Sequence, residues 1–163
     1  MILELSAQRL WKRLSAADRQ AAASHLFAEP APEAVAGAFG VIARARRMRP
    51  QAVRAMSPEA QARAVGSILD PGEALSASLL VALHLGERRA LLAAFLDAMR
   101  LPHEDGILKE EAESEPKPTV DGLRAGIQAL DAFPKDQVAT YLNTLFLQDP
   151  ERWRALADTD VPA

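Results

Sequence analysis

Apolar residues recur at every third or fourth position along most of this chain, which is the spacing of amphipathic helices. Alternating runs of β-branched or aromatic residues are missing, so the pattern predicts no strand of ordinary length. Ser, Thr and Pro stand where helices should begin, and Pro or Gly follows where they should end. The predicted helices span residues 3–14, 15–28, 33–48, 51–56, 57–69, 74–85, 91–99, 120–130, 138–146 and 151–157.

The segment 74–85 is apolar on almost every side, except for its Ser residues and a thin strip shared by Glu73 and His84. A helix of that kind is buried in a larger helical assembly, and twelve residues are too few to span a bilayer. Gly86 predicts the end of this helix, and 91–99 then forms the second helix of a pair. Gly37 and Gly40 weaken helix 33–48, so we expect another backbone to approach there.

Three segments share one order of residue types. Ser15, Ser57 and Thr119 each open a helix as potential caps, and a Pro-containing turn and a second helix follow each. The first two copies start 42 residues apart. The unit is similar in length and helix-pair form to HEAT and armadillo repeats, a resemblance of architecture that carries no family function. We therefore predict an all-α fold, either a helical bundle or a short right-handed solenoid of helix pairs.

Residues 101–119 interrupt the helical pattern with three Pro and six acidic residues. We predict one domain over 1–163 with an exposed acidic connector there, mobile between 110 and 118. The composition is otherwise that of an ordinary globular protein, with 49% hydrophobic and 25% charged residues. The chain has no Cys, and its N-terminus does not resemble a signal peptide; both favour the cytoplasm. Frequent Ala, Pro and Arg suggest a GC-rich bacterial source.

Charge is unevenly distributed along the chain. Residues 1–100 hold 13 Lys or Arg against 9 Asp or Glu, whereas residues 101–163 hold 6 against 13. Five Arg with no acidic residue between them form the densest basic cluster: Arg44, Arg46, Arg47, Arg49 and Arg54. Three interpretations stay open: a solvated or ion-paired helix end, a phosphate-binding surface, or a surface that meets acidic residues such as Glu110 and Glu111.

Candidate chemistry is sparse. No His pair has metal-ligand spacing, and no catalytic Ser motif, phosphate-binding loop or Cys is present. The sequence thus predicts no catalytic residues, no metal and no cofactor. An enzyme using His84, His103 and nearby carboxylates remains the alternative. Nucleic-acid binding through the Arg cluster is disfavoured, because the chain is acidic overall and no aromatic residue lies within the cluster.

These features favour a cytoplasmic protein–protein interaction module, a small helical-repeat scaffold or adaptor without catalytic activity. Its expected partner is another protein, with a second copy of the chain as one candidate, and not a membrane. The residues expected to bind the partner are Arg44, Arg46, Arg47, Arg49, Arg54, Glu110 and Glu111.

Overall fold

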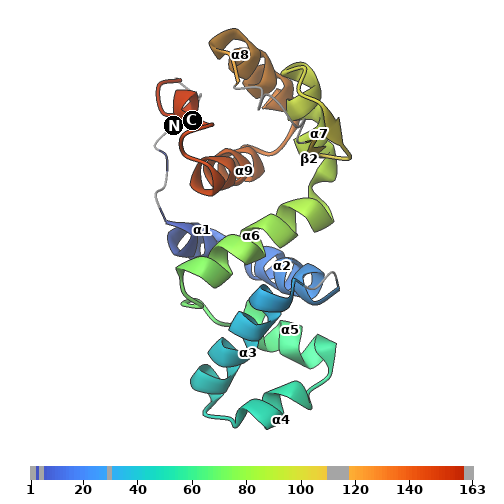
Figure 1. Cartoon of the computed structure of the whole chain (residues 1–163), viewed down its shortest axis with the longest axis vertical. Coiled ribbons are helices and arrows are strands. Elements are labelled where there is room, and N and C mark those ends of the chain that lie inside the picture. Colours follow the sequence, from blue (N-terminus) through green and yellow to red (C-terminus); the bar gives the residue numbers. More distant parts are fainter. Residues whose placement is uncertain (1–2, 4–5, 29–30, 110–117, 160–163) are drawn as a thin grey trace. The chain divides into compact units, whose positions relative to one another are not determined.

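A computed structural model describes residues 3, 6–28, 31–109 and 118–159 of the chain. These residues form nine α-helices, two short 3-10 helices and one two-stranded hairpin (Figure 1), so the all-α prediction is confirmed. The chain divides into two compact units, unit 1 (Met1–Leu5 and Arg88–Ala163) and unit 2 (Ser6–Glu87). That the whole chain behaves as one domain stays a prediction, as do the handedness and the repeat character of the helix pairs.

Unit 2 contains six helices, and α6 lies at its centre. The helices are α1 (Ala7–Arg13), α2 (Ala16–Ala28), α3 (Pro32–Arg46), α4 (Pro50–Arg54), α5 (Pro58–Gly66) and α6 (Glu73–Glu87). Helix α2 packs closely against both α5 and α6, and α1 packs against α6. Leu79, Leu80 and Leu83 of α6 are fully buried, as its nearly continuous apolar surface predicts.

Side chains satisfy the free backbone N–H groups at several helix starts. Ser57 caps α5 by accepting from Ala60 N at 3.2 Å, and Ser15 accepts from Asp18 N at 3.0 Å. Helix α1 begins at Ala7 with Ser6 as its cap, four residues later than the apolar pattern predicts. Fully buried Trp11 fastens α1 within the unit, because its indole N–H donates to Ile68 O at 2.8 Å.

The glycines of unit 2 correct two predictions. Gly86 does not end a helix: α6 continues through it to Glu87, and a Cβ there would collide with the His25 ring. The missing side chain therefore makes room where α2 crosses α6. Among the described residues, no backbone approaches Gly37 or Gly40, which was the expected reason for those two glycines. A backbone does approach Gly66, where a Cβ would lie 3.2 Å from Gln20 Cα.

Unit 1 is built around Phe95. Its elements are α7 (Arg89–Ala98), β1 (His103–Glu104), β2 (Ile107–Leu108), α8 (Val120–Ala129), η1 (Leu130–Ala132), α9 (Lys135–Gln148) and η2 (Arg154–Leu156). The fully buried Phe95 ring meets Tyr141 edge-on at 5.5 Å and Trp153 at 5.9 Å between ring centroids. Gly126 lets α8 approach, because a Cβ there would lie 2.8 Å from the Phe95 ring. Thr119 caps α8 through Gly122 N at 3.0 Å.

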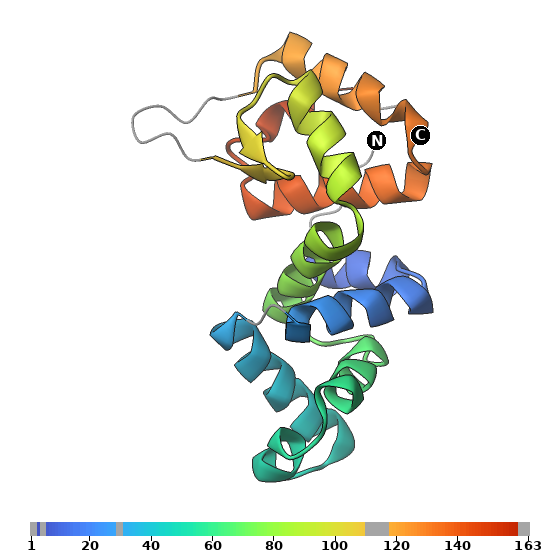
Figure 2. The same cartoon turned by 90° about the vertical axis from the view of Figure 1, so that its right-hand side faces the viewer.

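Part of the predicted connector is ordered against α7 (Figure 2). His103 pairs with Leu108 and Glu104 with Ile107 in an antiparallel hairpin that the sequence pattern did not predict. Leu101 and Gly106 are buried, and a Cβ on Gly106 would lie 2.8 Å from Leu92. Strands of two residues are too short to show alternation, which is why the pattern missed them. Of the part expected to be mobile, residues 110–118, all but Pro118 lie outside the described residues.

The predicted core is confirmed at its four central positions, since Leu79, Leu83, Phe95 and Leu142 have no exposed surface. Among the described helices, none is long and apolar enough to cross a membrane.

Candidate interaction surface

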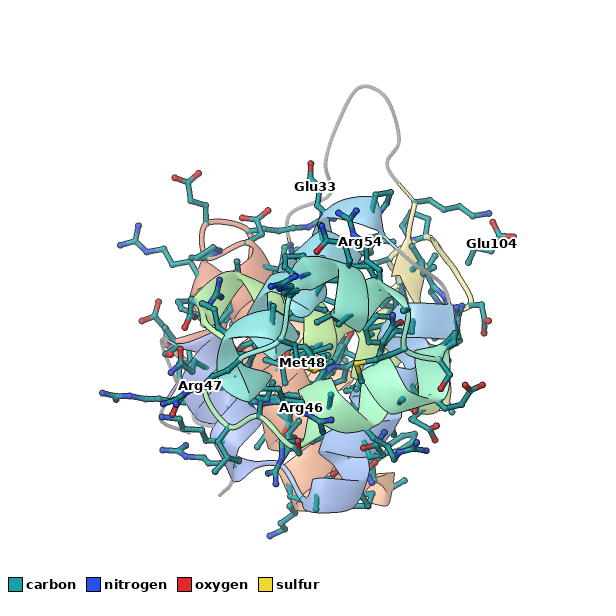
Figure 3. All side chains as sticks on the ribbon, turned by 90° about the horizontal axis from the view of Figure 1, so that it is seen from below. Glu33, Arg46, Arg47, Met48, Arg54 and Glu104 are labelled. Carbon is teal, nitrogen blue, oxygen red and sulfur yellow. The ribbon has the colours of Figure 1, made fainter. Side chains whose placement is uncertain are left out.

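The five clustered arginines lie where α3 ends and α4 begins. Arg44 and Arg46 occupy the last turn of α3, and Arg47 ends that helix in the left-handed conformation, with φ 52°. Arg49 precedes α4 as its N-cap, with Pro50 at the first helical position, and Arg54 is its last residue. All five are exposed, and we call them the Arg surface. Arg46, Arg47 and Arg54 are labelled in Figure 3.

Apolar and polar anchors hold this surface in place. Val53 is fully buried, and its carbonyl accepts from the buried Gln61 side chain at 3.0 Å, which ties α4 to α5. Met48 is half-buried between the two helices (Figure 3). These contacts form a local framework that carries the Arg surface. The five arginines themselves are exposed and are not among the residues that form these contacts.

Within the described residues, no ion pair joins any arginine of the Arg surface to an acid. Some cations elsewhere in the chain are paired, for example Lys12 with Asp70, and Arg89 with Asp105 at 2.9 Å. Positive charge at the end of α3 is favoured by the helix dipole, which explains Arg44 and Arg46 but not Arg49. An uncompensated positive patch attracts anionic groups within about 8 Å at physiological ionic strength. Glu110 and Glu111, the acids expected to meet it, lie outside the described residues.

Each of the three histidines makes contacts in a different part of the fold. His84 is buried and its Nδ1 donates to Leu80 O at 2.7 Å within α6. The Nε2 of His25 lies 2.7 Å from Glu87 Oε1 beside Gly86, where α2 crosses α6. Across the described part of the chain, no three His, Asp or Glu side chains gather as a metal site.

His103 forms the one Asp–His pair that resembles a catalytic dyad. Its Nε2 lies 2.9 Å from Asp97 Oδ1, and its Nδ1 accepts from Gly106 N at 3.2 Å. A general base needs one ring nitrogen facing the substrate, and here the hairpin backbone and the Asp occupy both. We therefore interpret Asp97–His103 as a clip that fastens the hairpin to α7, together with the Arg89–Asp105 pair.

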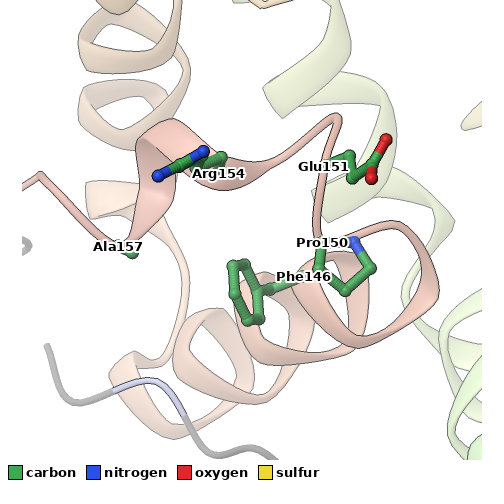
Figure 4. A pocket seen from close by; sticks show the side chains of 5 residues that line it. All are labelled: Phe146, Pro150, Glu151, Arg154 and Ala157. Atoms are coloured by element: carbon green, nitrogen blue, oxygen red, sulfur yellow. The ribbon is translucent and has the colours of Figure 1, made fainter.

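Unit 1 contains a hollow of about 630 Å³ lined by Phe146, Pro150, Glu151, Arg154 and Ala157 (Figure 4). The Phe146 ring points into it, and Arg154 lies along its upper edge. Among the described residues that line it, Glu151 and Arg154 are ionisable, and both are exposed. No nucleophile or acid–base pair lines the hollow, so its lining suits an apolar contact better than a reaction.

Acidic groups whose pKa is shifted lie at contacts between helices. Burial alone would raise the pKa of Glu73, but hydrogen bonds from Ala7 N, Ser6 Oγ and Gln8 N lower it overall. Hydrogen bonds from Lys12 and Gln8 lower the pKa of Asp70, and burial raises that of Tyr141. The sequence pattern places Glu73 on a polar strip and gives no sign that this residue caps α1.

No protein-family model, no curated protein and no solved structure matches the chain in the comparisons made.

Proposed function

We propose that this chain is a non-catalytic protein–protein interaction module that binds an acidic surface of its partner through the Arg surface. One observation carries the proposal: five exposed arginines gather on two adjoining helices, and none pairs with an acid in the described residues. Guanidinium groups bind carboxylates in a bidentate way and so recognise acidic protein surfaces with defined geometry.

The alternative partner for such a surface is nucleic acid. The segment from Arg44 to Arg54 contains no aromatic residue on which a base could stack, and the chain as a whole carries a net charge of −3. Both features favour a protein partner. We propose further that Glu110 and Glu111 of the same chain compete for the Arg surface, because they carry the charge that a partner would present.

The test compares what three tagged proteins capture from an extract of the native cell after nuclease treatment. They are the parent, the variant Arg46→Glu with Arg54→Glu, and the control Arg124→Glu with Arg154→Glu. The control reverses two exposed arginines of unit 1 and so makes the same change in net charge. All three should melt at nearly the same temperature, since exposed charges contribute little to stability.

The proposal expects a protein that the parent and the control capture and the Arg-surface variant loses. Its affinity should fall about tenfold or more, and the difference should shrink at high salt. Equal capture by all three proteins would refute the proposal. Tight binding of DNA or RNA at physiological salt, lost in the Arg-surface variant, would assign the surface to nucleic acid instead.

A further inference from the structure

Helix α3 has one side that the described residues of unit 2 leave uncovered. Glu33, Ala36, Gly37 and Arg44 are exposed and Gly40 is half-buried, and we call these five residues the open face of α3. Their spacing of three and four residues places them along one side of the helix. Ala38, Val41 and Ile42, on the other side, are buried.

The described part of the chain does not explain the two glycines at the middle of the open face. A Cβ on Gly37 would meet nothing within 4 Å, and one on Gly40 would meet only the Arg44 side chain at 3.6 Å. Gly in a helix interior is less favourable than Ala, so the two weaken α3 without any gain in its own packing. At Gly66 and Gly86, by contrast, a neighbouring helix occupies the space.

Opposite charges lie at the two ends of the open face. Glu33 lies in the first turn of α3 and Arg44 in the last, and neither forms an ion pair with any described residue. Glu33 extends away from the ribbon in Figure 3. Eleven residues separate the two, which is about 16 Å along a helix. The midpoint between Glu33 and Arg44 is also the midpoint between Gly37 and Gly40.

This arrangement is self-complementary. A two-fold axis through that midpoint, perpendicular to the helix, would bring Glu33 of each copy opposite Arg44 of the other. It would also place the glycines of both copies at the centre, where missing side chains let two helices approach closely. A parallel arrangement would instead bring Arg44 against Arg44, which is repulsive.

We propose that the open face of α3 binds the same face of a second copy, as an antiparallel pair of helices. The inference rests on the proposed function in one respect: this end of unit 2 faces proteins. The partner that we propose for the open face is a second copy of the chain. Arg46, Arg49 and Arg54 are not needed for the contact, so a dimer would present two Arg surfaces to an acidic partner and gain avidity.

A contact made by one helix face is small. Interfaces below about 1,200 Å² belong to weak and transient complexes, so the dimer should form and dissociate with protein concentration. Its charge pairs lie at the rim, and its affinity should therefore fall as salt increases.

The test exchanges the charges of Glu33 and Arg44, which face each other across the two-fold axis. The parent, Glu33→Arg, Arg44→Glu and the double variant are compared by sedimentation over a range of concentrations at low and physiological ionic strength. Each single variant places like charges opposite each other twice, and its dimer should dissociate roughly tenfold more readily than the parent. The double variant restores both opposite-charge pairs and should regain dimerisation. No partner other than a second copy carrying the same exchange would produce that rescue.

Gly37→Leu is an independent second variant. It fills the centre of the open face, where the chain itself offers space, and Leu is a better helix former than Gly. The expected result is loss of the dimer with an unchanged or higher melting temperature of the monomer. That combination excludes misfolding as the reason for the loss.

Three results would overturn the dimer: a parent that stays monomeric at its highest concentration, single variants that still dimerise, or a double variant without rescue. The proposed function fails separately. A monomeric parent that still loses its partner through Arg46→Glu with Arg54→Glu would refute only the dimer. A dimer with the expected rescue but with capture unaffected by those two substitutions would refute only the role of the Arg surface.

Discussion

Glu73 connects the start of α1 to the start of α6, and its removal should weaken unit 2 measurably. The carboxylate accepts from Ala7 N at 2.5 Å, Ser6 Oγ at 2.9 Å and Gln8 N at 3.2 Å. It also lies in the first turn of α6, so one negative charge faces the N-terminal ends of two helices. Seven residues are too few for α1 to be stable alone, and it therefore depends on such contacts.

The loss of stability on removing the Glu73 carboxylate follows from these contacts. Loss of a helix cap costs about 0.5–2 kcal/mol, and Glu73 serves two backbone donors with a charged acceptor. Because the side chain is exposed, solvent screens part of this interaction. We expect Glu73→Ala to lower the free energy of unfolding by about 1–2 kcal/mol and Glu73→Gln by about half of that. Glu59→Gln, an exposed first-turn acid of α5, is the matched control and should change little.

The same contact predicts a pH dependence. Since the pKa of Glu73 is lower in the folded protein than its ordinary value of 4.5, its contribution to stability is complete above about pH 4.5. It is lost as pH falls through the folded pKa. Urea unfolding at a series of pH values should therefore show the parent and Glu73→Gln converging in acid and differing at neutral pH. Equal stability of the two proteins at neutral pH would refute this account of α1.

Two further predictions concern the cores. Leu79→Ala should destabilise the protein by about 2–5 kcal/mol in urea unfolding, because it leaves a cavity at a fully buried position of α6; an unchanged midpoint would show that α6 is not central. If the chain is one cooperative domain, calorimetry should show a single transition whose calorimetric and van't Hoff enthalpies agree. Two separate transitions would instead show that units 1 and 2 unfold independently.

The helices were predictable because their signals are local. Ser57 and Thr119 cap the helices that they were expected to cap, and the apolar spacing located Leu79 and Phe95 in the two cores. What failed depended on contacts between distant residues. Gly86 looks like a helix stop in sequence, but a ring 61 residues earlier, that of His25, decides its role.

In the candidate site, too, local signals were predictable from the sequence and contacts between distant residues were not. The cluster of arginines is visible in sequence, whereas the absence of ion pairs between them and the described acids can be known only once the chain is folded. The Asp97–His103 clip gave no recognisable spacing, since six residues and a helix end separate its members. Glu110 and Glu111 were predicted from charge alone and remain a prediction.

The packing of unit 2 also predicts which of its helices should unfold locally first. Helices α1, α2, α5 and α6 pack against one another, whereas α3 packs less extensively against its neighbours than α2 does, and α4 buries only Val53. Segments with few buried apolar contacts open locally at a lower free energy than the global transition. In native-state hydrogen exchange, amides of α3 and α4 should therefore exchange well before those of α2 and α6. The surface that we assign to partners would then lie on the least protected part of its unit, and a bound partner would slow its exchange more than that of any other helix.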